Sequence, residues 1–121
     1  MSAHTDLVDR YMEGFRRSDH EMVLSCLTDD VTWHLAGHTD LAGKEAFDGE
    51  IENDAFEGKP VLTVDRTVED GDTVVIVGRG EGTLAGGTPF RFEFSDVFVF
   101  ADDLITRVES YIVPLTSPSG A

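Results

Sequence analysis

From Pro60 to Val113, apolar and polar residues alternate with a period of two, and short runs rich in Gly and Asp divide the alternation. Successive side chains of a β-strand point to opposite faces, so this pattern predicts strands with one covered and one open face. The predicted strands are Val61 to Val68, Thr73 to Leu84, Pro89 to Phe100 and Leu104 to Val113. The runs between them are short enough for hairpin turns, which predicts an antiparallel meander.

The first half of the chain has a helical pattern instead. Apolar residues at i, i+3, i+4 and i+7 predict a helix from about Thr5 to Ser18; they are Val8, Tyr11, Met12 and Phe15. Asp19 is expected to cap a second, shorter helix that buries Met22, Val23, Cys26 and Leu27. A short strand, Val31 to Leu35, and a third helix near Lys44 to Glu52 follow. Helices followed by a meander predict an α+β fold with the helices packed on one face of the sheet.

Length and charge restrict the class of protein further. The 121 residues suit one domain, predicted here as residues 1–121 with order from about 5 to 115 and a frayed C-terminal tail. With 24 acidic and 9 basic residues the net charge is −15, which disfavours nucleic acid and anionic membrane surfaces as partners. Cys26 is the only cysteine, so an intrachain disulfide is impossible. Without a signal peptide or a long apolar run, we expect a cytoplasmic protein.

One strand carries an unusual stripe. Its even positions contain five phenylalanines and a single carboxylate: Phe90, Phe92, Phe94, Asp96, Phe98 and Phe100. A strand face this apolar must be covered by other parts of the fold, and the Asp96 side chain is then buried with it. Burial disfavours the charged form of a carboxyl and raises its pKa, which makes Asp96 a candidate acid or base. The alternative is a structural Asp that is hydrogen-bonded to a neighbouring strand.

Assumed two-residue turns predict what lies across from Asp96. With Asp102-Asp103 as one turn, Glu109 lies opposite Asp96, Arg107 opposite Phe98 and Tyr111 opposite Phe94. With Gly86-Gly87 as the other, Val77 lies opposite Asp96 and Arg79 opposite Phe94. These registers predict a pocket floor of Asp96, Glu109, Arg107, Arg79 and Tyr111. A slip of one residue would move the partners of Asp96 to the other face, as a ladder of exposed ion pairs.

Several short motifs resemble those of a known group of proteins. They are Arg10-Tyr11, Ser18-Asp19, Leu27-Thr-Asp-Asp30-Val-Thr32, Gly71-Asp-Thr-Val-Val75, Gly78-Arg-Gly80, Asp96-Val-Phe98 and Arg107-Val-Glu-Ser-Tyr111. In these motifs and in its element order the chain resembles the SnoaL-like branch of the nuclear-transport-factor-2-like superfamily. That branch includes polyketide cyclases and ketosteroid isomerases. The resemblance covers nearly the whole chain and implies a cone-shaped fold with three helices on a strongly curved sheet.

The resemblance also implies roles for individual residues. Tyr11 matches the oxyanion-hole tyrosine of ketosteroid isomerases, and Asp96 matches their protonated aspartate, a carboxylic acid that an apolar site keeps neutral. The general base of those isomerases matches Leu35, a departure for which His38, Asp40 and Glu109 are candidate replacements. Side chains expected to contact the substrate are Phe15, Trp33, Leu35, Arg79, Phe94, Phe98, Arg107 and Tyr111.

Other patterns have plainer explanations. Tyr11 and Trp33 equally suit core positions. His34 and His38, with Asp40, could hold a metal, but on a strand and loop the two rings do not share a face, so no metal is expected. The glycines of Gly78-Arg-Gly-Glu-Gly82 lie in a strand pattern and predict a bend or bulge rather than a phosphate-binding loop.

Two classes of function remain open. The first is a cofactor-free acid/base enzyme, an isomerase or cyclase acting on a small hydrophobic carbonyl compound, with an epoxide-hydrolase-like variant built on Arg107, Glu109 and Asp96. The second is a ligand-binding or dimerisation module without catalysis. In both cases we expect a small hydrophobic ligand, no cofactor and a homodimer formed through the outer face of the sheet.

Overall fold

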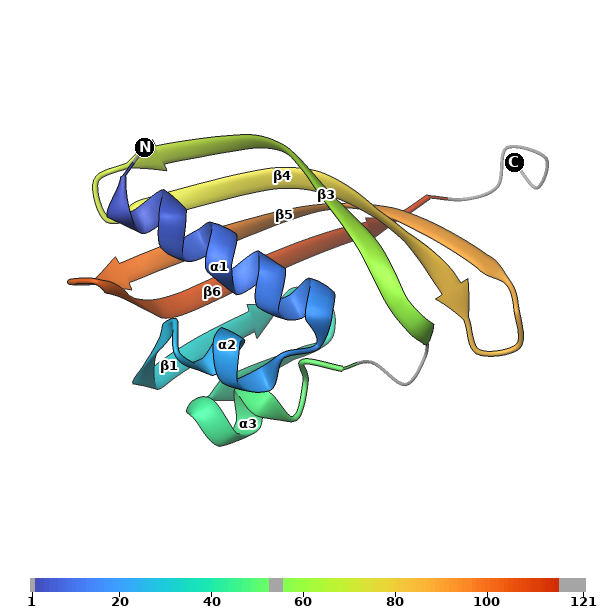
Figure 1. Ribbon diagram of the computed structural model, residues 1–121, viewed down its shortest axis with the longest axis horizontal. Helices are drawn as coiled ribbons and strands as arrows, with labels where there is room; N and C mark the ends of the chain where they lie inside the picture. Colours follow the sequence, from blue (N-terminus) through green and yellow to red (C-terminus); the bar gives the residue numbers. More distant parts are fainter. Residues whose placement is uncertain (1, 53–55, 116–121) are drawn as a thin grey trace.

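The computed structural model describes residues 2–52 and 56–115, with the side chains of residues 56 and 57 left aside. In these ranges three helices lie on one side of a curved six-stranded sheet (Figure 1). The helices are α1 (Ala3–Arg17), α2 (His20–Leu24) and α3 (Lys44–Asp48). The strands are β1 (Leu27–Leu35), β2 (Thr39–Ala42), β3 (Phe56–Asp70), β4 (Thr73–Leu84), β5 (Pro89–Ala101) and β6 (Leu104–Pro114). The predicted α+β fold is confirmed.

Local sequence signals explain the two N-terminal helices. Ser2 caps α1, and its side chain and that of Thr5 bond each other's backbone N–H groups in a capping box. Asp19 caps α2 as predicted and accepts a hydrogen bond from the N–H of Met22 at 3.1 Å. The two helices approach closely at Gly14, where a Cβ would lie 2.7 Å from Cγ2 of Val23. Between the helices, Ser18 ends α1 in the left-handed conformation, with φ of 52°.

The sheet has the strand order β2-β1-β6-β5-β4-β3. The meander β3 to β6 is antiparallel, as the alternation predicts, but β1 runs parallel to β6. The sheet is therefore mixed rather than wholly antiparallel. The short strand β2 was not predicted; it folds back on β1 through residues 36–38. The third helix is also shorter than predicted and ends at Asp48.

The core lies between the helices and the inner face of the sheet. Fully buried side chains come from all three helices and from the strands β1, β4, β5 and β6. The largest are Tyr11, Phe47, Phe98, Leu27, Ile76 and Ile105. No described helix is long and apolar enough to cross a membrane.

Two details of pairing differ from the predicted registers. The β4–β5 loop, residues 85–88, is closed by a hydrogen bond from Leu84 N–H to the carbonyl of Thr88 at 2.8 Å, and Thr83 pairs with Pro89. Ile76 rather than Val77 therefore pairs with Asp96. The β5–β6 turn is the predicted one, since Ala101 pairs with Leu104, but a β-bulge follows at Thr106. Beyond this bulge Asp96 pairs with Ser110 instead of Glu109.

Candidate active site

A cavity of about 340 Å³ opens between α1 and the inner face of the sheet. Most of its wall is apolar, with polar groups at a few points. Its lining residues are Tyr11, Met12, Phe15, Trp33, Leu35, Ala36, His38, Glu50, Ile51, Pro60, Leu62, Phe92, Phe94, Asp96, Ser110 and Ile112. A concave apolar site with few polar groups is the usual form of a small-molecule binding site.

Two glycines of β4 make room for the aromatic wall. A Cβ on Gly80 would overlap the ring of Phe92, 2.6 Å from Cε2, and a Cβ on Gly78 would lie 2.9 Å from Cζ of Phe94. The missing Cβ atoms leave space for the two rings, and both rings line the cavity. The sequence predicts a bend or a bulge at these glycines; the two register shifts of this strand pair lie in β3, between Glu57 and Val61 and between Val64 and Arg66.

Asp96 places a carboxyl group in the mostly apolar wall of the cavity. The residue is partly exposed to the cavity, yet its surroundings are dry enough that burial raises its pKa to about 6. The Ser110 hydroxyl, on the paired position of β6, opposes this shift by hydrogen bonding to the carboxyl. Asp96 thus changes charge near neutral pH, where proton exchange is most efficient.

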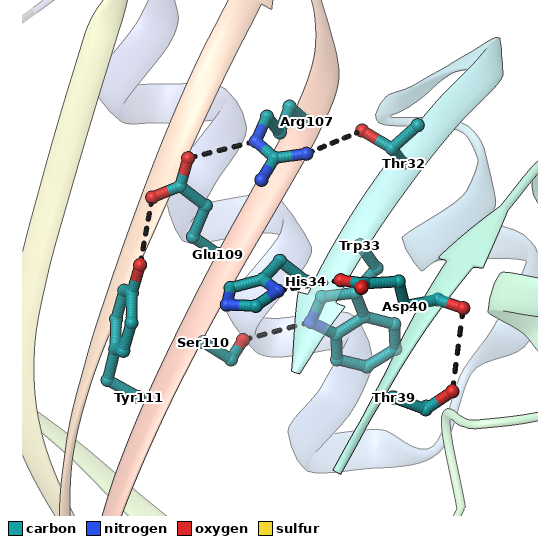
Figure 2. A network of polar contacts seen from close by, with 9 residues as sticks. All are labelled: Thr32, Trp33, His34, Thr39, Asp40, Arg107, Glu109, Ser110 and Tyr111. Carbon is teal, nitrogen blue, oxygen red and sulfur yellow. Dashed lines mark hydrogen bonds and ion pairs between the residues drawn. The ribbon is translucent and has the colours of Figure 1, made fainter. Parts of the chain in front are cut away.

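Ser110 is a site residue that sequence reasoning missed. The residue is 5 % exposed, and its Oγ accepts a hydrogen bond of 2.9 Å from the indole N–H of Trp33 (Figure 2). Because that oxygen accepts from Trp33, its own proton is free to point to Asp96. Only the bulge at Thr106 puts Ser110 on the inner face, so the strand alternation alone could not reveal it.

Tyr11 contributes a second polar group from α1. Burial raises its pKa well above the usual value, and the nearby charge of Asp96 adds to the effect. Its hydroxyl is therefore protonated, and within the described ranges it makes no hydrogen bond to another residue. Tyr11 lines the cavity although only 2 % of the residue is exposed, and a protonated hydroxyl there can donate to a developing oxyanion.

The remaining predicted inner-face residues fall into two groups. Phe15, Trp33, Leu35 and Phe94 line the cavity, as does His38, whose Nε2 lies 3.9 Å from Oε1 of Glu50. Phe98 does not: it is fully buried in the core and its ring meets that of Tyr11 at 5.0 Å. Its predicted contact with a substrate is wrong, because α1 covers this part of the stripe.

Five predicted site residues lie on the opposite face of the sheet. In Figure 2, Arg107 donates to Glu109 at 2.9 Å and to Thr32 at 3.3 Å, and Tyr111 donates to Glu109 at 3.1 Å. His34 joins Asp40 at 2.6 Å on the same side. Arg79 pairs with Asp65 at 3.2 Å. This outer-face network combines ion pairs with hydrogen bonds, and its Arg107–Glu109 pair is half-buried.

These side chains face outward because successive side chains of a strand point to opposite faces, so that a shift of one residue exchanges the two faces. The extra residue at Thr106 turns Arg107, Glu109 and Tyr111 outward. The β4–β5 register differs by one residue from that of a Gly86-Gly87 turn, so Arg79 pairs with Glu93 and also faces outward. The predicted floor of five polar groups is therefore wrong, and Asp96 with Ser110 takes its place. The pKa of Glu109 is lowered by its hydrogen bond from Arg107, which suits a paired surface carboxylate rather than a base.

The histidines do not assemble a metal site. His34 faces outward with Asp40, whereas His38 lies at the cavity. Across residues 2–52 and 56–115, no three His, Cys, Asp or Glu side chains are placed to hold a metal ion.

A comparison with family models now identifies the group to which this chain belongs. The SnoaL-like domain model matches residues 8–108, which is most of the chain. The chain is a member of the SnoaL-like family. The resemblance drawn from the sequence motifs is thereby confirmed. None of the curated proteins compared matches the chain.

Solved structures agree on the fold of this SnoaL-like protein. An NTF2-like protein of unknown function from Burkholderia pseudomallei has a TM-score of 0.84 at 22% identity, with 92% of this chain and 91% of that one covered. A putative ketosteroid isomerase from Kribbella flavida has a TM-score of 0.78 at 20% identity, covering 96% and 82%. An LEH-like epoxide hydrolase from M. tuberculosis also has 0.78, at 18% identity, covering 91% and 82%. At these identities the likeness establishes the fold alone.

Proposed function

We propose that this SnoaL-like protein binds a small hydrophobic carbonyl compound in its cavity and exchanges a proton with it through Asp96. The observation that carries the proposal is a carboxyl whose pKa burial raises to about 6, placed in the wall of a mostly apolar cavity. Such a group is ionised enough to accept a proton and acidic enough to return it. The reaction class is isomerisation or cyclisation without a cofactor.

The proposed step moves one proton and one electron pair. The Asp96 carboxylate takes a proton from the carbon next to the carbonyl, and the C–H electron pair forms an enolate. The Tyr11 hydroxyl donates a hydrogen bond to the enolate oxygen, where charge develops. In an isomerisation, protonated Asp96 then returns the proton to the same or another carbon. In a cyclisation, the enolate carbon attacks a second carbonyl, and protonated Asp96 gives its proton to the alkoxide that forms. Ser110, fixed by the Trp33 indole, orients the carboxyl.

Hydrogen–deuterium exchange tests the chemistry without knowledge of the natural substrate. We expect the protein to accelerate exchange of the acidic C–H protons of 2-tetralone in D₂O, followed by NMR, with a rate that rises as Asp96 ionises near pH 6. Asp96→Asn should reduce exchange to the buffer rate, and Tyr11→Phe should reduce it by roughly 10²-fold. Glu109→Gln removes a carboxylate from the outer face and serves as the matched control. Undiminished exchange in Asp96→Asn would refute the proposal.

Ligand binding without turnover is the second candidate. It is favoured by Leu35, an apolar side chain that lines the cavity where the resemblance to ketosteroid isomerases places the general base. In this case flat apolar ketones or phenols should change the fluorescence of Trp33, the only tryptophan, while no exchange occurs. The epoxide-hydrolase-like variant loses its support, because Arg107 and Glu109 lie on the opposite face from Asp96.

A further inference from the structure

The cavity has an unbalanced charge. The ionisable residues of its lining are Tyr11, His38, Glu50 and Asp96, and none of the described lining residues is a lysine or an arginine. Asp96 faces Ser110 across the strand pair and Tyr11 on α1, both neutral. An ionised carboxylate in apolar surroundings is costly without a cationic partner. Of the described lining residues, His38 alone can become cationic near neutral pH, and its Nε2 lies 3.9 Å from Oε1 of Glu50, the other carboxylate of the lining.

Basic residues of the surrounding elements have hydrogen-bond or ion-pair partners outside the cavity lining or lie on the far face of the sheet. Arg16, on the helix that covers the cavity, donates to the carbonyl of Leu62 at 3.1 Å and pairs with Glu13 at 3.5 Å. Lys59 donates to the carbonyl of Arg17 at 2.7 Å. Arg107 is held by Glu109 and Thr32 on the far face of the sheet. With a net charge of −15 over the whole chain, the surrounding field also favours a positive ligand.

Aromatic rings supply the rest of a cation site. Tyr11, Phe15, Trp33, Phe92 and Phe94 all line the cavity. Neighbouring rings meet at 4.9 Å for Tyr11 and Phe15 and at 5.9 Å for Phe15 and Trp33. The faces of such rings carry partial negative charge and attract ammonium groups, most strongly where water is excluded.

We infer that this cavity binds hydrophobic ammonium compounds, with Asp96 as the counter-ion and the aromatic wall around the cationic head. The inference rests on the cavity of the proposed function but not on turnover. It also predicts that carboxylates are excluded, since Asp96 and Glu50 would both repel them.

Three probes of similar shape separate charge from hydrophobicity. Benzyltrimethylammonium carries a permanent positive charge, neopentylbenzene is its neutral isostere, and phenylacetate is negative. We expect benzyltrimethylammonium to bind at least roughly tenfold more tightly than neopentylbenzene, measured by NMR titration in moderate salt. Phenylacetate should not bind detectably.

Variants assign the preference to a residue. Asp96→Asn should abolish the preference for the cation and leave neopentylbenzene binding unchanged, whereas Glu109→Gln should leave both unchanged. Because the probe cannot lose a proton, its affinity should fall as the pH drops through the titration of Asp96 near 6. If the affinity falls in the same way in His38→Gln, that histidine is not the group whose titration weakens binding. The variant Glu50→Gln tests the other carboxylate of the lining in the same way.

Equal affinity for the cation and its neutral isostere would overturn the inference. So would a preference that survives in Asp96→Asn, because it would then arise from the overall negative charge or from Glu50. The proposed function is tested by a separate measurement, the hydrogen–deuterium exchange of 2-tetralone. Exchange can be absent while the protein binds the cation, and it can be present while the protein does not prefer the cation to its neutral isostere.

Discussion

Asp96 experiences two opposing effects at the scale of a single residue. The aromatic wall withholds water and favours the neutral acid, whereas the Ser110 hydroxyl favours the carboxylate. The balance leaves a pKa of about 6, about two units above the ordinary value for Asp, 3.8. The folded protein therefore binds a proton at Asp96 more tightly than the unfolded chain does.

This difference predicts how stability depends on pH. A raised pKa stabilises the fold below the unfolded value of about 3.9, and the gain is lost as the pH rises from about 4 through about 6. At neutral pH the loss amounts to about 3 kcal/mol. Asp96→Asn should remove this dependence, so that the variant is at least as stable as the native protein above pH 7. Urea denaturation of both proteins at several pH values measures the difference. A variant several kcal/mol less stable at neutral pH, with ligand binding kept, would instead make Asp96 a paired structural group.

Ser110 offers a second prediction at this scale. In Ser110→Ala the pKa of Asp96 should rise further, because the hydrogen bond that lowers it is removed. The Trp33 indole N–H also loses its partner, which costs about 1–3 kcal/mol. Carbon NMR titration of the Asp96 carboxyl measures the first effect and urea denaturation the second. Trp33→Phe is the control: it removes the indole donor and leaves the Ser110 hydroxyl in place. A lower pKa of Asp96 in Ser110→Ala would contradict the assignment.

At the scale of elements, backbone geometry decides which side chains reach the cavity. The glycines of β4 lie on the inner face opposite Phe92 and Phe94, and their missing side chains leave space for those rings. The bulge in β6 selects Ser110 rather than Glu109 as the partner of Asp96. Neither feature involves a group that could react, yet together they define the shape and the polarity of the site.

Replacing Gly80 tests the role of this strand. In Gly80→Ala the new methyl group overlaps the Phe92 ring, which must turn toward the cavity. We expect a loss of about 1–3 kcal/mol in the free energy of unfolding and weaker binding of cavity ligands. Gly49→Ala is the matched control, since its Cβ would lie 3.6 Å from the nearest atom, an ordinary contact. The double variant Gly80→Ala with Phe92→Ala should regain the cavity. Unchanged ligand binding in Gly80→Ala would disprove this account.

At the scale of the whole molecule, the outer face of the sheet and the net charge act against each other. Valines at positions 75, 77, 97 and 99 lie on this face, beside the outer-face network of Arg107, Glu109 and Tyr111. Apolar side chains in the middle of an open sheet face are typical of an interface. Two copies with a charge of −15 each also repel one another, most strongly in low salt.

We therefore propose a homodimer through this face that weakens as salt is removed. Light scattering at micromolar concentration should give a dimer in moderate salt and a larger monomer fraction in low salt. Val97→Asp should yield a monomer, because it puts a charge in the middle of the face. Ala85→Asp adds the same charge in the exposed β4–β5 loop and should leave the dimer intact. A native protein that is monomeric in moderate salt would rule this interface out.

The sequence alone determined those features that depend on neighbouring residues. The alternation along β5 put Asp96 on the face of the phenylalanines, because the parity of side chains within one strand is a local property. The spacing of Tyr11 and Phe15 likewise put both on the face of α1 that lines the cavity, because helical periodicity is also local.

Tertiary structure decided what faces Asp96. Whether Ser110 or Glu109 lies across from it depends on a single extra residue in β6, and the bulge forms where Ile105 packs in the core while Arg107 reaches Glu109 and Thr32 outside. The parallel pairing of β1 with β6 is also non-local, and it brings Trp33 to Ser110 across 77 residues of sequence. A one-residue change of register exchanges the two faces of a strand, and its energy is set by contacts between distant segments that no local pattern records.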